Sequence, residues 1–383
     1  MQVYLDNSAT TKPSPAAANA LKDAAEMHWY NPSALYKPAM DVEKRVSEAR
    51  ECCLRAVHAT SHRLVFTSGG TEADNLAITG YLRTVKKGGK VLYFQGEHPA
   101  VRACMDEARR LGFTAEEIPS TSQGMMDIAS LERQLTADTV LLCLMQVNNE
   151  TGAVQPVSEA VSLRNRLAPK AAIHVDGVQG YLRVPLDFNR SGIQSYAFSG
   201  HKIHACKGIG GLILHKSHRV SPLMLGGGQE NGLRSGTENT PGILCLGEAV
   251  RTYPADALPR MAALKEQLWK GIRERIPAAV QNGPTIGTSG AAPHILSVSL
   301  PPVRSQTMLF ALEGDGIYVS AGSACASHSQ RVSPVLTGMG MDRSMADCTL
   351  RFSFGIYNTE EEISYTVERI AAQYAVLSKY IRK

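Results

Sequence analysis

The chain has 383 residues, of which 44% are hydrophobic and 20% are charged. This composition is typical of a folded protein with a large core and excludes disorder over most of the length. No apolar run approaches the roughly 20 residues of a membrane-spanning helix, and no signal peptide is visible at the N-terminus. A net charge of +5 without long Lys/Arg runs gives no reason to expect nucleic acid or a membrane as a partner, although it is compatible with a small anionic ligand.

The eight cysteines form neither a CxxC motif nor a Cys/His cluster with zinc spacing. In a long chain without a secretion signal, such thiols are expected to be reduced. We therefore expect a cytoplasmic protein with no intrinsic metal site.

Short apolar strands alternate with helical patterns over the first part of the chain. In chain order, the expected elements are strand 63–68, helix 71–82, strand 90–95, helix 99–111, strand 115–118, helix 128–135, strand 140–145, helix 156–167 and strand 171–175. This alternation predicts βαβ units and an α/β fold with a mostly parallel sheet.

The pattern changes near residue 254, where residues 254–259 are predicted to form a linker. The elements expected after it are helix 258–276, strand 295–299, helix 306–312, strand 317–320 and an amphipathic helix from about 359 to 380. We therefore expect a large domain at 13–254 and a smaller α+β domain that combines 1–12 with 255–383.

A glycine turn precedes the helix that opens at Thr71, in the segment Ser68-Gly69-Gly70-Thr71-Glu72. Free N–H groups at a helix start bind anions, and glycine lets a phosphate approach the backbone. The alternative is a plain helix cap with a tight turn, because threonine is a common cap.

A lysine in a glycine-rich context follows at Ser199-Gly200-His201-Lys202. Such a lysine serves as a Schiff-base amine, a phosphate ligand or a solvated surface charge. His201 and Lys207 are neighbours that could hold the amine unprotonated.

Asp176 stands at the carboxyl end of an apolar strand, where open α/β sheets bind ligands. A carboxylate there could pair with a protonated ring nitrogen, as pyridoxal cofactors require, or could cap a helix. His98, before Pro99, is by itself more typical of a cap than of a catalyst.

Cys325 lies among small and polar residues at 320–329, directly after a predicted strand. This composition predicts a mobile surface loop and makes Cys325 the best nucleophile candidate, with an incidental surface thiol as the alternative. Arg351, flanked by apolar residues, needs an acidic partner, which is either a substrate carboxylate or a structural ion pair.

Ten segments in one order resemble the cysteine desulfurases of the NifS/IscS type, which are group I members of the class-V aminotransferase family. They are LDNSATT (5–11), NPS (31–33), SGGTEADNLAI (68–78), EHPAV (97–101), VNNETG (147–152), HVDGVQ (174–179), SGHK (199–202), GGGQENGLRSGTEN (226–239), SAGSACAS (320–327) and LRFSFG (350–355). The resemblance implies a fold type I transferase that depends on pyridoxal 5'-phosphate. Its large domain would hold a mostly parallel seven-stranded sheet, followed by a smaller C-terminal α+β domain.

The resemblance also implies a role for each matching position. Lys202 would hold the cofactor covalently, Asp176 would pair with its pyridinium nitrogen, and His98 would stack on the ring and shuttle protons. The other cofactor contacts would come from Gly70, Thr71, Asn148, Gln179, Ser199, His201 and, across a homodimer interface, Thr237.

The implied substrate is L-cysteine, bound by Asn31, Asn148 and Arg351, with Arg351 on its carboxylate. The Cys325 thiolate would take the sulfur as a persulfide, and L-alanine would be released. The persulfide would pass to an acceptor protein such as an iron–sulfur scaffold or a tRNA-thiolation enzyme, and Cys325 would be a candidate transient cluster ligand there.

Three alternatives stay open from the sequence: a selenocysteine lyase, another class-V enzyme with a different substrate, and a non-catalytic scaffold. The sequence also departs from the family pattern. Tyr36 and Gln146 stand where histidine is usual, Gly177-Val178 replaces the usual small-residue pair, and Cys206 adds a thiol four residues after Lys202.

Overall fold

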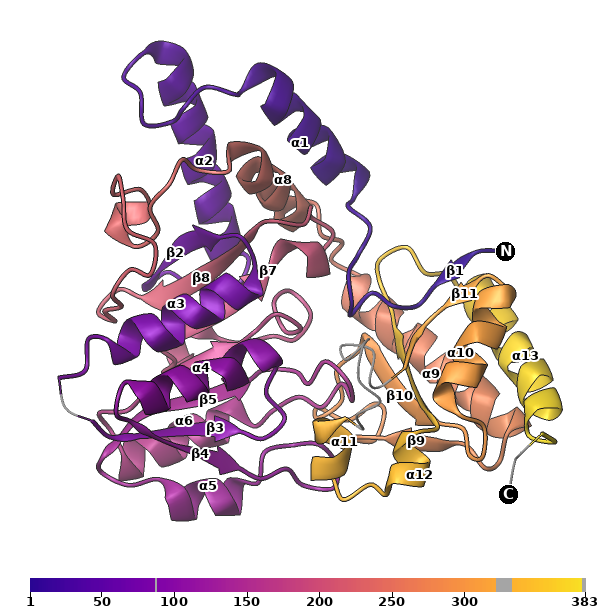
Figure 1. Cartoon of the computed structure of the whole chain (residues 1–383). Coiled ribbons are helices and arrows are strands. Elements are labelled where there is room, and N and C mark those ends of the chain that lie inside the picture. The colour runs from indigo at the N-terminus through magenta and orange to yellow at the C-terminus, as the bar shows by residue number, and fades with distance from the viewer. Residues whose placement is uncertain (87, 322–332, 381–383) are drawn as a thin grey trace.

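The computed structural model describes residues 1–86, 88–321 and 333–380. Figure 1 shows a large lobe, built from a central sheet with helices on both faces, beside a smaller lobe that holds the C-terminal third of the chain. No helix in the described ranges is both long and apolar enough to cross a membrane.

The large lobe holds a seven-stranded sheet in the order β2-β8-β7-β6-β5-β3-β4. Its strands are β2 (His62–Thr67), β3 (Lys90–Phe94), β4 (Thr114–Ile118), β5 (Thr139–Met145), β6 (Ala172–Asp176), β7 (Ser195–Ser199) and β8 (Gly210–His215). Strand β8 pairs antiparallel with both β2 and β7, and the other strand pairs of this sheet are parallel. The predicted mostly parallel seven-stranded sheet is therefore confirmed.

Helices cover both faces of this sheet, as expected for a parallel sheet joined by crossover helices. They are α1 (Pro15–Met27), α2 (Lys37–Arg55), α3 (Gly70–Leu82), α4 (Pro99–Arg110), α5 (Ile128–Gln134), α6 (Val157–Leu167), α7 (Phe188–Ser191) and α8 (Thr240–Arg251). One face packs against α3 and α4, and the opposite face packs against α2, α6 and α8.

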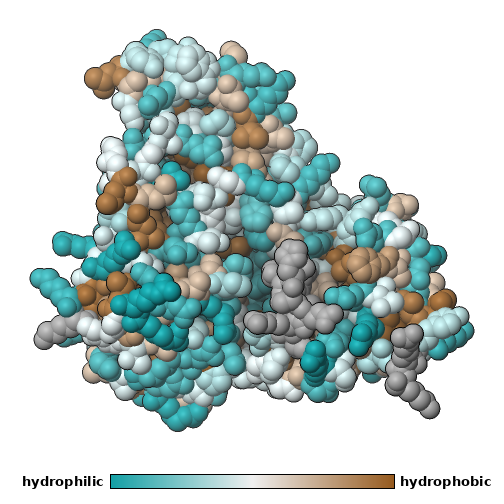
Figure 2. All heavy atoms as spheres, in the orientation of Figure 1, coloured by the Kyte–Doolittle hydropathy of each residue, from teal (hydrophilic) through white to brown (hydrophobic). Residues whose placement is uncertain are grey.

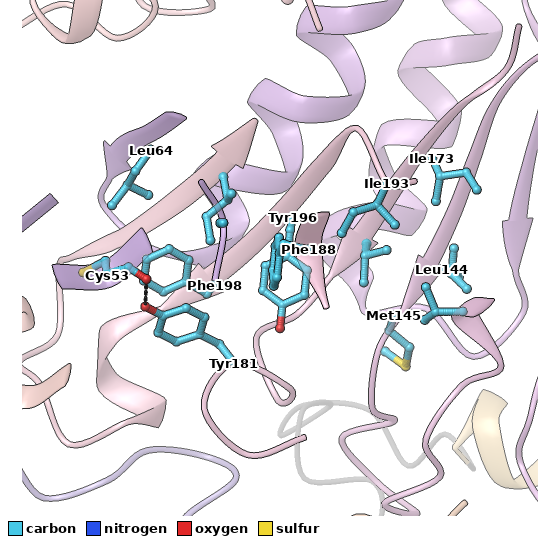
Figure 3. Close-up of a cluster of buried hydrophobic side chains, with 14 of the residues drawn as sticks. Cys53, Leu64, Leu144, Met145, Ile173, Tyr181, Phe188, Ile193, Tyr196 and Phe198 are labelled. Atoms are coloured by element: carbon cyan, nitrogen blue, oxygen red, sulfur yellow. Dashed lines mark hydrogen bonds between the residues drawn. The ribbon is translucent and has the colours of Figure 1, made fainter. Parts of the chain in front are cut away.

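Aromatic side chains fill the core on the α2 and α8 side (Figure 3). The ring of Tyr181 stacks on Phe198 at 4.2 Å between centroids, and its hydroxyl donates to the carbonyl of Cys53 at 2.8 Å. Phe188 meets Tyr196 edge to face at 4.9 Å. These contacts pack the segment that follows β6 against β7.

The smaller lobe contains a four-stranded antiparallel sheet in the order β12-β13-β10-β9 and a parallel pair, β1-β11. Its elements are β1 (Val3–Tyr4), α9 (Ala257–Arg275), β9 (Val280–Asn282), β10 (Ile295–Ser299), α10 (Ser305–Gly314), β11 (Ile317–Tyr318), β12 (Ser320–Ala321), α11 (Pro334–Gly338), α12 (Arg343–Ala346), β13 (Thr349–Ser353) and α13 (Glu360–Leu377). The N-terminal residues Val3 and Leu5 are buried in this core.

Two predicted elements differ from the structure. The linker at 254–259 is too long, because α9 begins at Ala257 and includes Pro259 in its first turn, where a missing N–H costs little. The predicted strand 317–320 is two strands, since β11 pairs with β1 while β12 pairs with β13 in the other sheet.

Candidate active site

A pocket of about 430 Å³ lies where the carboxyl ends of β5, β6 and β7 meet the start of α3 and the N-terminal segment. Parallel strands bring their carboxyl ends to one edge of a sheet, so polar residues that follow different strands gather there. Nine residues singled out from the sequence line this pocket: Gly70, Thr71, His98, Asp176, Gln179, Ser199, His201, Lys202 and Arg351.

Lys202 ends a single 3₁₀ turn, η1 (Gly200–Lys202), that directly follows β7. Its Nζ donates to the carbonyl oxygens of Ser8 at 2.5 Å and Ala9 at 2.7 Å. The amine is therefore placed in the pocket by the large sheet and held by the N-terminal segment.

Asp176 is the last residue of β6 and is only 5% exposed. Its Oδ1 accepts a hydrogen bond from the backbone N–H of Val178 at 2.9 Å. Burial raises the pKa of Asp176, although His98 and Lys202 lower it. A buried carboxyl at a pocket wall fits a ligand that brings a protonated ring nitrogen, because that ligand supplies the missing positive charge.

His98 is the N-cap of α4 and also lines the pocket, so the cap role and the site role coincide. Its Nδ1 accepts from the backbone N–H of Ala100 at 3.2 Å. Burial lowers the pKa of His98, with Asp176 raising it and Lys202 lowering it further. The ring is therefore neutral at neutral pH, and Nε2 is the nitrogen that carries its proton.

The start of α3 offers a site for a phosphate group. A Cβ added to Gly70 would lie 2.5 Å from Cγ2 of Val178, so only glycine leaves this space open. Thr71, Ser199 and His201 line the same pocket. Free N–H groups at the start of a 13-residue helix, together with hydroxyl groups, suit a phosphate.

The Ser8 hydroxyl supports a polar ligand in this pocket. Ser8 is 2% exposed, lines the pocket, and its Oγ has no hydrogen-bond partner in the described part of the chain. Buried hydroxyl groups are normally paired, so an unpaired one fits a ligand that completes the site. The residues present thus fit pyridoxal phosphate.

Arg351 lies on β13 of the smaller lobe and reaches the pocket with a side chain that is 8% exposed. Its Nη2 pairs with Oδ1 of Asp6 at 2.8 Å, and its Nη1 donates to the carbonyl of Asn149 at 2.9 Å. Its Nε is buried and has no partner among the described residues. The structural ion pair that one sequence-based interpretation expects is therefore present, and the contact with a substrate carboxylate stays a prediction.

Known proteins with this architecture agree with the geometry. The Aminotransferase class-V family matches residues 3–366. A cysteine desulfurase of Nostoc sp. is 36% identical over 370 residues, which cover 96% of this chain and 91% of the relative. A solved NifS-like protein has a TM-score of 0.91 at 31% identity, covering 98% of this chain and 100% of that chain.

The chain belongs to the class-V aminotransferase family. A further solved structure, SspA in complex with cysteine, has a TM-score of 0.80 at 26% identity, covering 94% of this chain and 100% of that one. The named relatives therefore favour the desulfurase interpretation over the alternatives that the sequence left open.

Three of the singled-out residues that the structure describes do not line the pocket of this class-V protein. Asn148 is fully buried, and its side-chain oxygen accepts from the backbone N–H groups of Glu150 and Thr151. Asn148 thus holds the turn after β5, while the next residue, Asn149, lines the pocket. Asn31 and Thr237 are exposed in the single chain, and Cys325 lies outside the described residues.

Several pocket residues had no role assigned from the sequence. Asp6, Ser8 and Ala9 belong to the LDNSATT segment, and their position in that motif was the available signal. Asp74, on α3, also lines the pocket and contacts Nε2 of His174 at 3.1 Å. Burial raises the pKa of Asp74 and lowers the pKa of His174 to about 3. The two side chains therefore form a buried hydrogen bond at the wall of the pocket.

Two departures from the family pattern are explained by one packing arrangement. The hydroxyl of Tyr196 donates to Oε1 of Gln146 at 2.6 Å. A Cβ on Gly177 would lie 1.8 Å from the Tyr196 ring, and one on Gly180 would lie 1.9 Å from Oε1 of Gln146. The glycine at 177 and the glutamine at 146 are therefore fitted to Tyr196.

Cys206, the thiol added near Lys202, does not line the pocket. Its backbone N–H donates to Sγ of Cys245 at 3.2 Å, and it packs against the core of the large lobe. A hydrogen bond from Cys245 lowers the pKa of Cys206 to about 7, against the opposing effect of burial.

Proposed function

We propose that this protein is a pyridoxal-phosphate-dependent L-cysteine desulfurase that releases L-alanine and retains the sulfur as a persulfide on Cys325. The observation that carries the proposal is the convergence of Lys202, Asp176, His98 and Arg351 on one pocket. The names of the class-V relatives support the same activity.

The cofactor would be held by groups from several elements. Lys202 would bind its aldehyde, and Asp176 would pair with its ring nitrogen. Gly70, Thr71 and the hydroxyl groups near them would hold its phosphate. When bound, pyridoxal phosphate supplies an electron sink that stabilises negative charge on the substrate carbons.

The side chains of this chain then bind the substrate and move protons. Arg351 binds the α-carboxylate of cysteine through the donors that Asp6 and Asn149 leave available. Nδ1 of His98 is occupied by the α4 cap, so Nε2 is the atom that exchanges a proton. The Lys202 amine is the second proton carrier, because it lines the same pocket.

The sulfur step needs a thiolate acceptor. The acceptor attacks the sulfur of cysteine, so a sulfur–sulfur bond forms as the carbon–sulfur bond breaks. The electron pair of the broken bond goes to the carbon fragment, which is protonated to alanine. We assign the acceptor to Cys325 from the sequence, since this residue lies outside the described part of the chain.

One experiment tests the activity and the acceptor together. The cofactor-loaded protein is incubated with L-cysteine, alanine is quantified, and the persulfide is located by peptide mass. We expect one alanine per persulfide and the added sulfur on the Cys325 peptide. Absence of alanine from the loaded protein would refute the proposed activity.

Variants separate Cys325 from the nearest other candidate. Cys325→Ser is expected to bind cysteine but to release no sulfide with a thiol reductant, because a hydroxyl does not accept sulfur. Cys206→Ser is the control and should retain turnover. Normal turnover in Cys325→Ser together with its loss in Cys206→Ser would move the nucleophile to Cys206.

We further propose that the protein acts as a homodimer and passes sulfur to an acceptor protein such as an iron–sulfur scaffold or a thiolation enzyme. Large apolar side chains are exposed around the α1–α2 connection, namely Met27, Trp29, Leu35, Tyr36 and Met40, with Leu35 93% exposed. In Figure 2 a brown, hydrophobic side chain projects at the upper left of the molecule, where the upper edge is otherwise mostly pale. Such a patch favours burial against a second copy, in which the exposed Thr237 would reach the phosphate of the partner site.

A further inference from the structure

Arg183 is the largest fully buried side chain among the described residues, with 1% of its surface exposed. No carboxylate of the described ranges lies within ion-pair distance of it. Burial lowers the pKa of Arg183, against the opposing effect of Tyr253, and the neighbouring His294 is itself a basic group. Burying a guanidinium without a counter-ion costs free energy of folding, so the hydrogen bonds of Arg183 must offset this cost.

Two hydrogen bonds of Arg183 go to residues of the candidate active site, and a third joins its side chain to Tyr253, which does not line the pocket. Nη1 donates to Oε1 of Gln179 at 3.0 Å, and Nη2 donates to the carbonyl oxygen of Lys202. Gln179 and Lys202 line the pocket, whereas Arg183 lies behind them and does not. One guanidinium thus joins the turn after β6 to the turn η1 after β7.

The contact with Gln179 decides which end of its amide faces the pocket. A guanidinium carries only donors, so the atom of Gln179 that meets it must be the oxygen. The amide nitrogen then lies on the other side, where Nε2 donates to the carbonyl of Ser8 at 2.9 Å. An amide nitrogen carries two hydrogens, so a second N–H is left for a ligand in the pocket.

We propose that Arg183 is a positioning residue of the cofactor site: it orients the Gln179 amide as a donor and holds the Lys202 turn in place. The ligand atom that needs this donor is the phenolic oxygen of the pyridoxal ring, an inference that rests on the proposed function. If the Gln179 amide were reversed, its Oε1 would face the carbonyl oxygen of Ser8 and its NH2 group would face the Arg183 guanidinium, and both contacts would be repulsive. Arg183 therefore acts on the ligand through Gln179 and Lys202 and not by contact.

A second buried arginine in the large lobe supplies a matched control. Arg164, on α6, is 6% exposed and donates to three acceptors: the carbonyls of Ala171 at 2.7 Å and Gly192 at 2.5 Å, and Oε1 of Gln194 at 3.5 Å. Its Nε is unpaired within the described chain, as is the Nε of Arg183. Arg164 does not line the pocket and contacts none of its residues in these bonds, so Arg164→Met reproduces the structural loss alone.

The first measurement uses the cofactor-free protein. Glutamine side chains are labelled with ¹⁵N, and the Gln179 amide is assigned by its absence in Gln179→Ala. In the NMR spectrum of Arg183→Met we expect the Gln179 amide signal to shift and the chemical shifts of its two protons to move closer together, because Oε1 is no longer held by the guanidinium. Arg164→Met should leave it unchanged.

The second measurement is the dissociation constant of pyridoxal phosphate, followed by titration. Loss of one oriented hydrogen bond predicts a rise of about tenfold in Arg183→Met and less than twofold in Arg164→Met. Because the two residues act together, Gln179→Ala combined with Arg183→Met should raise the constant by less than the product of the single effects. Arg183→Lys keeps the charge and one donor and should fall between wild type and Arg183→Met; it also replaces Arg183→Met if that variant does not fold.

The proposal is overturned if the Gln179 amide signal is the same in wild type and in the Arg183 variants. It is equally overturned if Arg183→Met and Arg164→Met have the same dissociation constant for pyridoxal phosphate. The same holds if the double variant at 183 and 179 raises this constant by the full product of the two single effects. Failure of the wild-type protein to bind pyridoxal phosphate would instead refute the proposed function. The amide signal of the cofactor-free protein would still report on Arg183 in that case.

Discussion

At the residue scale, single side chains serve local structure and the site at once. His98 caps α4 through Nδ1 and lines the pocket. Arg351 forms an ion pair with Asp6 and still has a buried donor without a partner among the described residues. Choosing between a structural and a functional role from the residue type alone is therefore not possible here, because the same atoms fix the side chain and prepare it for a ligand.

Lys202 is the residue whose loss should have the largest chemical effect. Lys202→Ala removes the only amine that we assign to the aldehyde of the cofactor, so we expect at least a thousandfold loss of alanine formation. Borohydride treatment followed by peptide mass should find the cofactor on Lys202 in wild type and no stable adduct in the variant. A reducible adduct in the variant would place the attachment on another lysine.

Glu150 predicts a pH dependence of stability. Burial raises the pKa of Glu150 to about 7, against the effects of Ser333, whose hydroxyl donates to the carboxyl at 2.5 Å, and of Arg351. The folded protein therefore holds a proton that the unfolded chain releases above its ordinary pKa of 4.5. The contribution of this proton to the stability of the folded protein is fully present below pH 4.5 and is lost as the pH rises to about 7.

Glu150→Gln removes that titration. The free energy of unfolding of wild type should fall by about 2 kcal/mol more than that of the variant when the pH is raised from 5 to 8. Urea unfolding of both proteins at the two pH values measures this difference. Parallel stability curves for the two proteins would show that Glu150 has an ordinary pKa.

At the element scale, the carboxyl end of β6 is packed against the first half of β7 through Tyr196. The tyrosine ring fills the space next to Gly177, and its hydroxyl reaches Gln146 at the end of β5. Asp176 is the neighbour of Gly177 in the chain, so this packing helps to set where the Asp176 carboxyl lies.

Gly177→Ala should be strongly destabilising, because its Cβ would lie 1.8 Å from the Tyr196 ring. Overpacking of a core costs about 1–3 kcal/mol, and we expect the upper end of that range in urea unfolding. In a Tyr196→Leu background the same substitution should cost less than 1 kcal/mol, because a smaller side chain leaves room. Equal costs in the two backgrounds would contradict this account of the family departures.

At the scale of the whole molecule, the pocket exists only because distant parts of the chain meet. The N-terminal strand β1 pairs with β11, and Arg351 of β13 reaches Asp6 across 345 positions of sequence. Ser8 and Ala9 in turn receive the Lys202 amine. The smaller lobe and the N-terminus therefore complete a site whose base is the large sheet (Figure 1).

The exposed apolar patch at the α1–α2 connection predicts an assembly larger than one chain. Sedimentation should give twice the chain mass for wild type, and Leu35→Asp should shift the equilibrium toward the monomer by placing a charge in the contact. Phe310→Asp, at an apolar side chain of α10 that is 67% exposed, is the control and should leave the mass unchanged. A wild-type monomer with full activity would exclude Thr237 as a residue of the partner site.

The sequence by itself determined strands β2 to β6 of the large lobe, the four helices between them and nine of the residues that line the pocket, but it did not indicate β7 and β8. Those elements follow from local hydrophobic periodicity, and motifs such as SGHK and HVDGVQ are contiguous in the chain. Both can therefore be recognised without knowledge of the fold. The split of 317–320 into β11 and β12 was not legible, because strand partners are chosen across the chain. The tertiary structure alone decided that Asn149 and not Asn148 lines the pocket, that Asp6 pairs with Arg351, and that Arg183 stands behind Gln179. Each of these depends on which way a side chain points and on what distant segment it meets, and neither property is encoded in local spacing.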